Sequence, residues 1–208
     1  MTKLGRPPVL YLITDRRLVL SRSVLDLIEE AAHAGVDLIQ IREKDLPTRT
    51  LCALVEDTAA RIAGTGARLL VNDRVDVAMT CGAHGVHLTT QSLPAAVVRR
   101  IVGPNVLIGA STHSLEEAQE AEAGGADFLV LGPVFETPSK SPYGPPLGVE
   151  TFARIVAQIR IPVLAIGGIT PENAPRVLAQ RAAGIAAIRM FAEAEQLAPL
   201  VARLKEMR

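Results

Sequence analysis

Short apolar runs recur along the chain, and each has the length of a β-strand. The runs are Val9–Ile13, Leu38–Ile41, Leu69–Val71, Gly85–Leu88, Val106–Ile108, Phe128–Leu131, Val163–Ile166 and Ile185–Ile188. They are nearly continuous instead of alternating between apolar and polar residues. That pattern is typical of parallel strands that are buried on both faces.

Amphipathic segments rich in Ala, Leu and Glu separate these runs and have apolar positions at helical spacing. The predicted helices are residues 24–32, stopped by Gly35, residues 51–62, ending at Gly64, residues 94–101, residues 114–123, and a segment that starts at Thr170-Pro171-Glu172. Ser114 and Glu117 have the spacing of a capping box, which marks a helix start. The glycines mark helix ends, because glycine readily adopts the left-handed conformation found there.

Eight repeats of a strand followed by a connecting segment predict an α/β fold, a single (β/α)8 TIM barrel that occupies residues 1–208 as one domain. An open flavodoxin-like or Rossmann-like sheet is the alternative. These open sheets are less favoured for two reasons. Eight strands are too many for a flavodoxin-like sheet, and the GxGxxG motif of a Rossmann-like sheet does not follow the first apolar run. In a barrel, functional residues lie where the strands end, at the C-terminal mouth.

The composition narrows the class of function. The 208 residues carry no net formal charge, and no Lys/Arg-rich run is present, which argues against a nucleic-acid partner. No apolar stretch reaches the length of a membrane span, and the first residues do not read as a signal peptide, so we predict a cytoplasmic protein without a membrane partner. Cys52 and Cys81 follow no metal or disulfide spacing and are predicted to be free thiols.

Basic side chains follow two of the predicted strands. Alternation along the second run places Gln40, Arg42 and Lys44 on one side, where they would be costly to bury without an anionic or polar ligand. The alternative is an ion pair with a neighbouring glutamate that closes the end of the barrel. Lys140 lies among hydroxyls and glycines after the sixth run, where it suits a phosphate or diphosphate, although a solvated surface lysine gives the same pattern.

Other strand ends carry amides, carboxylates and hydroxyls. Asn72-Asp73 reads either as a metal or hydrogen-bonding corner or as a helix N-cap. His87 stands inside an apolar run and is interpreted as a core histidine with satisfied hydrogen bonds. Ser111 belongs to a polar segment that follows the fifth run and is a candidate site residue. Ser114 in the same segment is expected to be the N-cap of the next helix.

A second anion site is predicted at the seventh and eighth strand ends. Gly167-Gly168 precedes a helix start and exposes backbone N–H groups, and the amides after Ile188 would complete the cradle. Barrels commonly hold a phosphate between these two loops. Two anion sites at one mouth suit a reaction that joins two phosphorylated molecules.

Seven segments in order along the chain resemble the thiamine phosphate synthase and thiazole tautomerase family. They are YLITD (11–15), QIREK (40–44), NDRVDVA (72–78), GVHL (85–88), GASTHS (109–114), GADFLVLGPVFETPSK (125–140) and AIGGI (165–169). Thiamine phosphate synthase joins hydroxymethylpyrimidine diphosphate to thiazole phosphate and releases pyrophosphate. The resemblance therefore implies an enzyme with small phosphorylated substrates, with or without oligomer formation.

The resemblance also implies a role for each matching residue. Arg42, Lys44, Asn72 and Lys140 would hold the diphosphate, Gln40 would touch the pyrimidine, Ser111 would assist either group, Asp73 would bind Mg²⁺, and Thr137, Gly167, Gly168, Ile188 and Arg189 would hold the thiazole phosphate. Arg42, Lys44, Lys140 and Ser111 form the predicted catalytic set.

The chain departs from the synthase pattern at two positions. Ser92 replaces an aspartate that serves as a second metal ligand, so the Mg²⁺ site is predicted to be weakened. Arg189 replaces a serine at the end of the eighth strand. These changes keep open a metal-independent thiazole tautomerase, although Pro133 occupies the position of that enzyme's histidine. A third hypothesis is a non-catalytic binder of thiazole or thiamine phosphate.

Overall fold

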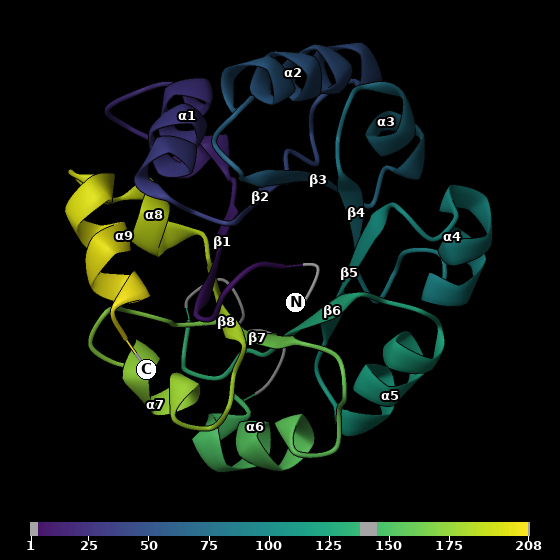
Figure 1. Ribbon diagram of the computed structural model, residues 1–208, viewed down its shortest axis with the longest axis vertical. Helices are drawn as coiled ribbons and strands as arrows, with labels where there is room; N and C mark the ends of the chain where they lie inside the picture. The colour runs from purple at the N-terminus through teal and green to yellow at the C-terminus, as the bar shows by residue number, and fades with distance from the viewer. Residues whose placement is uncertain (1–3, 138–144, 208) are drawn as a thin grey trace.

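The computed structural model describes residues 4–137 and 145–207, and these residues form a closed barrel of parallel strands surrounded by helices (Figure 1). Each strand pairs with the next one in sequence, and the last strand pairs with the first, in the order β1 to β8. The predicted (β/α)8 barrel is therefore confirmed.

The strands match the predicted apolar runs closely. They are β1 Val9–Ile13, β2 Leu38–Ile41, β3 Arg68–Asn72, β4 Gly85–Leu88, β5 Leu107–Thr112, β6 Phe128–Leu131, β7 Val163–Ala165 and β8 Gly184–Ala187. The main difference is β5, which was predicted to end at Ile108 and continues through Gly109 to Thr112. Hydrophobicity alone misses these residues, because they are small or polar and are held by the β6 ladder, where Ser111 is opposite Val130.

Helices connect the strands and cover the barrel. They are α1 Val24–Ala34, α2 Thr48–Arg61, α3 Val75–Thr80, α4 Ala95–Val102, α5 Leu115–Ala123, α6 Gly148–Val156, α7 Ala174–Leu178, α8 Arg189–Ala192 and α9 Leu197–Lys205, with a 3-10 turn η1 Arg16–Leu18 after β1. The start predicted at Thr170 is wrong, since α7 begins only at Ala174. Asn173 accepts a hydrogen bond from the Thr170 N–H through its side chain, and this turn delays the helix.

The predicted capping box at α5 is half confirmed. Ser114 Oγ accepts a hydrogen bond from the Glu117 N–H at 3.2 Å, as expected for an N-cap. The Glu117 carboxylate, however, accepts from the N–H of His113 and not from that of Ser114. The helix therefore starts where the sequence indicated, with the acid reaching one residue further back.

Two apolar layers hold the fold together. The outer layer fills the space between the strands and the helices, and the inner layer fills the barrel itself. Tyr11, Leu70 and Phe128 belong to the inner layer, together with Leu4, which precedes β1 and packs into the N-terminal end of the barrel. That end is thus closed, and the polar side chains gather at the opposite end. No helix among the described residues is long and apolar enough to cross a membrane.

Candidate active site

Polar residues at and just past the C-terminal ends of β2, β3, β4 and β5 become more exposed along the chain direction. Gln40 and His87 are buried, Asn72, Ser111 and Arg42 are half-buried, and Asp73 and Lys44 are exposed. The ladders keep these residues together, since Asn72 lies opposite His87 on the neighbouring strand. The barrel thus brings Gln40, Asn72 and Ser111 to neighbouring strand ends, beside the buried His87.

Arg42 lies just past β2, with its backbone N–H donating to Thr14 Oγ1 at 3.0 Å. Its charge lowers the pKa of Asp15, after the Arg17 contacts, and also that of His87, after burial, so the guanidinium lies near both side chains. It forms no ion pair with a described carboxylate. An arginine in this position is well suited to binding an anionic ligand.

Glu43 explains why Arg42 has no carboxylate partner. Glu43 is buried and accepts hydrogen bonds from the backbone and the guanidinium of Arg16, at 3.0 and 2.9 Å. Arg16 also contacts both carboxylate oxygens of Asp45. Arg42 itself thus forms no ion pair with a glutamate, and the arginine–glutamate pair at this strand end joins Glu43 to Arg16 of the loop after β1.

The predicted ladder of Gln40, Arg42 and Lys44 is only partly formed. β2 ends at Ile41, so strand alternation no longer governs Lys44, which is exposed. Lys140 lies outside the described residues. Thr137, at the edge of the described part of this loop, is half-buried.

Asp73 occupies an unusual backbone conformation, with a φ of 63° in the left-handed region. Its N–H donates to the carbonyl oxygen of His87 at 2.8 Å, which places it where β3 and β4 end. Arg74, not Asn72 or Asp73, is the N-cap residue of α3, so the N-cap alternative is wrong. Strained conformations of this kind are concentrated at functional sites.

Ser92 uses its hydroxyl within its own loop. Its Oγ accepts a hydrogen bond from the Thr89 N–H at 2.8 Å and lies 3.1 Å from Thr89 Oγ1. Among the described residues, no group of three His, Cys, Asp or Glu side chains is arranged to hold a metal ion. Asp73 is therefore suited to a Mg²⁺ ion only if other ligands, such as the oxygens of a substrate diphosphate, complete the coordination.

The Gly167-Gly168 turn packs against the segment after β6. A side chain at Gly168, where φ is 63°, would meet the Glu136 carbonyl oxygen at 2.3 Å and Phe135 Cβ at 2.8 Å, so only glycine fits. The Gly167 carbonyl accepts from the Phe135 N–H, whereas the N–H groups of both glycines donate to no described residue. These amides are suited to binding an anion.

Arg189 begins α8 directly after Ile188, its N-cap residue. Its guanidinium is exposed and lies 2.6 Å from a carboxylate oxygen of Glu193, one turn along the same helix. The side chain of Arg189 is thus engaged on the surface, and any contribution to an anion site would come from the backbone in this arrangement.

Tyr11 was not predicted as part of the site, and His87 was interpreted mainly as a core histidine. Tyr11 Oη lies 3.2 Å from His87 Nδ1, and His87 Nε2 lies 2.9 Å from Ser111 Oγ. His87 is thus buried and satisfied, as its interpretation as a core histidine required, but one of its partners is a predicted catalytic residue. A hydroxyl within the apolar YLITD motif was the signal in the sequence that could have pointed to Tyr11.

Burial shifts the acid–base properties of His87 and Tyr11. Desolvation, helped by the charge of Arg42, lowers the pKa of His87 to about 3, so the ring is neutral at neutral pH. Burial also raises the pKa of Tyr11 well above its ordinary value, opposed by the neighbouring Gln40 side chain. Gln40 approaches Tyr11 closely enough to affect its pKa, but the buried Gln40 Nε2 has no described acceptor within normal hydrogen-bond distance, so the amide can still donate to a ligand.

The buried His87 should make the protein sensitive to mild acid. Below about pH 6.5 the unfolded chain takes up a proton at this histidine, while the folded protein does so only near pH 3, so the free energy of unfolding falls as the pH drops. The loss by pH 5 is about 2 kcal/mol. Urea unfolding of the wild type and of His87→Gln between pH 7 and 5 should show a smaller loss in the variant. Equal losses would contradict a neutral buried His87.

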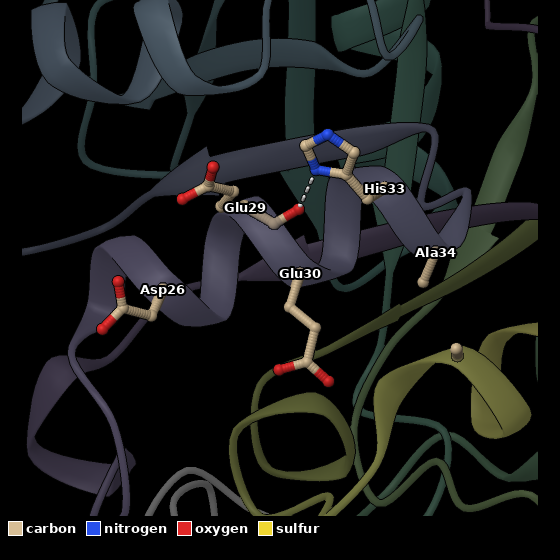
Figure 2. Close-up of a pocket in the computed structure, with 6 residues that line it drawn as sticks. Asp26, Glu29, Glu30, His33 and Ala34 are labelled. Atoms are coloured by element: carbon tan, nitrogen blue, oxygen red, sulfur yellow. Dashed lines mark hydrogen bonds between the residues drawn. The ribbon is translucent and has the colours of Figure 1, made fainter.

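A hollow on the outer surface is unrelated to the mouth. Asp26, Glu29, Glu30, His33 and Ala34 line it from α1, and Ala198 lines it from α9 (Figure 2). Arg61 pairs with Asp26 and Glu29, Arg22 pairs with Glu30, and His33 Nδ1 lies 2.9 Å from the Glu29 carbonyl. The charged side chains that line the hollow are thus paired with neighbouring side chains of the protein, and nothing in the hollow indicates a ligand site.

Comparisons with known proteins identify the family. The family model described as thiamine monophosphate synthase matches residues 10–191. The chain belongs to this family. It is 49% identical over 179 residues to a putative thiamine-phosphate synthase of Geobacter sulfurreducens, a match that covers 86% of this chain and 84% of the relative. It is 43% identical over 180 residues to the thiamine-phosphate synthase of Roseiflexus castenholzii, covering 86% and 79%.

Solved structures agree with this assignment. Thiamine phosphate pyrophosphorylase from Pyrococcus furiosus is 39% identical and superposes with a TM-score of 0.86, covering 96% of this chain and 95% of that structure. A structure titled native KDPGal is 20% identical with a TM-score of 0.68, and this match reflects the shared fold alone. The resemblance seen in the sequence motifs is therefore confirmed.

Proposed function

We propose that this protein is a thiamine phosphate synthase, which joins hydroxymethylpyrimidine diphosphate to thiazole phosphate and releases pyrophosphate. Membership of the family supports the reaction, since the matched relatives that carry a firm name are thiamine-phosphate synthases. The observation that carries the proposal to this chain is Arg42, a half-buried cation at the mouth without a carboxylate partner in the described residues. A partly buried cation without an ion-pair partner is costly, and an anionic ligand would offset that cost.

The proposed diphosphate site contains Arg42, Lys44, Asn72 and Lys140. In the reaction, the bond between the pyrimidine methylene carbon and the diphosphate oxygen breaks, and the thiazole nitrogen forms a bond to that carbon. The amino group of the pyrimidine stabilises the positive charge on its methylene, so the protein mainly has to stabilise the departing pyrophosphate. Fixed cations in a partly desolvated site provide that electrostatic stabilisation.

The remaining predicted residues would place the two organic groups. Gln40 would donate its buried, unpartnered Nε2–H to the pyrimidine, above the floor formed by His87. The N–H groups of Gly167 and Gly168, with the backbone after Ile188 and with Thr137, would hold the thiazole phosphate. Ser111 would donate to the pyrimidine or to the diphosphate.

We propose that Mg²⁺ binds between the protein and the substrate diphosphate. Asp73 would hold it together with oxygens of the diphosphate, and the bound ion would neutralise charge on the leaving pyrophosphate. A single protein carboxylate suits Mg²⁺, which often keeps water and substrate phosphates as its other ligands. We also propose that the protein acts in the cytoplasm.

One assay tests the proposed function against its alternatives. Incubation with both substrates should yield thiamine phosphate and pyrophosphate only when Mg²⁺ is present, and EDTA should stop the reaction. Isomerisation of thiazole phosphate carboxylate that persists in EDTA would favour the tautomerase. Thermal stabilisation by thiazole phosphate without any turnover would favour a non-catalytic binder.

Replacing Ser92 with aspartate should strengthen the metal site. The new carboxylate can still accept the hydrogen bond of the Thr89 N–H, and it adds a negative charge to the loop after β4. We expect the Mg²⁺ concentration that gives half-maximal rate to fall by about tenfold.

Gln91→Glu is the matched control for this substitution, because it adds a charge in the same loop at an exposed position. Its Mg²⁺ dependence should stay close to that of the wild type. If Ser92→Asp left the Mg²⁺ dependence unchanged, the loop after β4 would not reach the metal.

A further inference from the structure

A continuous series of hydrogen bonds crosses the barrel floor and ends at the mouth. It runs from Tyr11 Oη to His87 Nδ1 over 3.2 Å, and from His87 Nε2 to Ser111 Oγ over 2.9 Å. The three residues come from β1, β4 and β5, so only barrel closure brings them together. Tyr11 and His87 are buried, whereas Ser111 is half-buried and is the member of the series that faces the rim.

The imidazole of His87 has little freedom to reorient. Its ring lies between those of Tyr11 and Phe128, with centroids 5.7 and 6.1 Å away. On the β5 side the space exists only because Gly109 has no side chain, since a Cβ there would lie 2.7 Å from His87 Nδ1. Both ring nitrogens have a hydrogen-bond partner, and the packing fixes the ring in the orientation in which both hydrogen bonds form.

The hydrogen-bond partners indicate the direction of the protons. The Tyr11 hydroxyl has two neighbours, Gln40 and His87. The Gln40 side chain lowers the pKa of Tyr11 and therefore acts as a donor toward the phenol oxygen, which leaves His87 Nδ1 as the acceptor of the hydroxyl proton. With Nδ1 as acceptor, the proton of the neutral ring is on Nε2, and Nε2–H donates to Ser111 Oγ. Ser111 Oγ then accepts this hydrogen bond, and its own hydroxyl proton remains available to donate to a ligand at the mouth.

We infer that His87 is a positioning residue that holds the Ser111 hydroxyl as a hydrogen-bond donor to the bound pyrimidine diphosphate. The inference rests on the proposed function, in which Ser111 touches that substrate. His87 itself acts through Ser111 and stays neutral, because burial and the nearby cation Arg42 disfavour a charged ring. Without this support the hydroxyl would rotate freely and spend part of its time pointing elsewhere.

A double-mutant cycle between His87 and Ser111 tests this coupling. Ser111→Ala should lower kcat by about 100-fold, the lower end of the loss seen when one donor to a developing charge is removed. His87→Asn should cause a loss of similar size, because its short amide reaches the Nδ1 position and not Ser111. The double variant should be no more than about twofold slower than Ser111→Ala alone. Losses that multiply would overturn the inference.

His87→Gln and Val130→Ala serve as comparison variants. The longer amide of glutamine reaches the Nε2 position and can donate to Ser111, so His87→Gln should recover most of the kcat that His87→Asn loses. Val130 also belongs to the inner layer and lies opposite Ser111 on β6, without a hydrogen bond to it. The loss caused by Val130→Ala should multiply with that of Ser111→Ala. Equal losses in the Asn and Gln variants would contradict the positioning role.

Nitrogen-15 NMR of labelled histidines tests the same inference without turnover. The wild type should show His87 as the neutral Nε2–H tautomer at pH 7, and Ser111→Ala should shift its Nε2 signal. A proton on Nδ1, or an unchanged Nε2 signal, would refute it even if the His87 variants do not fold. A wild type that forms no thiamine phosphate yet shows this coupling would overturn the proposed function alone.

Discussion

Replacing Arg42 with alanine should lower kcat/KM for thiamine phosphate formation by at least about 100-fold while the barrel stays folded. The guanidinium lies near Asp15 and His87, and it forms no ion pair with a described carboxylate. Its planar set of donors matches two oxygens of a diphosphate, and its charge is most valuable when pyrophosphate leaves. Steady-state kinetics with varied diphosphate, beside thermal unfolding, would measure both effects.

Two further variants sharpen this experiment. Arg42→Lys keeps the charge and loses the paired donors, so its rate should lie between those of the wild type and Arg42→Ala. Arg100→Ala is the matched control, because Arg100 is exposed in the last turn of α4, which leads to the opposite end of the barrel. If Arg42→Ala were as active as Arg100→Ala, the proposed diphosphate site would be wrong.

Replacing Gly109 with alanine should destabilise the protein by about 1–3 kcal/mol, the usual cost of overpacking a core. The added Cβ would lie 2.4 Å from Phe128 Cζ and 2.7 Å from His87 Nδ1, and both rings are buried inside a closed barrel. One ring must therefore move. If it is His87, its hydrogen bond to Ser111 is disturbed as well, so activity should fall with stability. Urea unfolding and kcat measured on the same sample would show this.

Phe128→Leu offers a way to relieve the overlap. A leucine at this position removes the ring atoms that the new Cβ would meet, although alone it should leave a cavity and cost stability. The double variant Gly109→Ala/Phe128→Leu should therefore be more stable than the sum of the two single losses indicates. Purely additive losses would mean that the barrel avoids the overlap by moving its backbone.

The sequence predicted the barrel because its signals are local. Buried parallel strands form continuous apolar runs, and four of the eight predicted runs have the bounds of the observed strands, including Val9–Ile13 and Phe128–Leu131. The polar end of β5 was missed for the same reason, since Gly109 to Thr112 lack the hydrophobic signal and are held by pairing with β6. A ladder between strands is a contact at long range, and local composition does not report it.

The sequence indicated which residues of the candidate site lie at the mouth, but it did not indicate which side chains contact one another there. Strand ends identified Arg42, Asn72, Asp73 and Ser111 as residues of the mouth, because in a barrel all C-terminal strand ends meet at one rim. The sequence left open whether Arg42 pairs with a glutamate. It also left His87 without partners, although its neutral, buried character follows from an apolar run.

The sequence by itself determined the alternation of strands and helices, the family, and the rim on which the polar residues stand. Only the tertiary structure decided that Glu43 pairs with Arg16, and that His87 joins Tyr11 to Ser111. The physical reason is barrel closure. Contacts across the interior depend on the tilt and stagger of the strands and on gaps such as the one at Gly109, and these arise only when β8 pairs with β1.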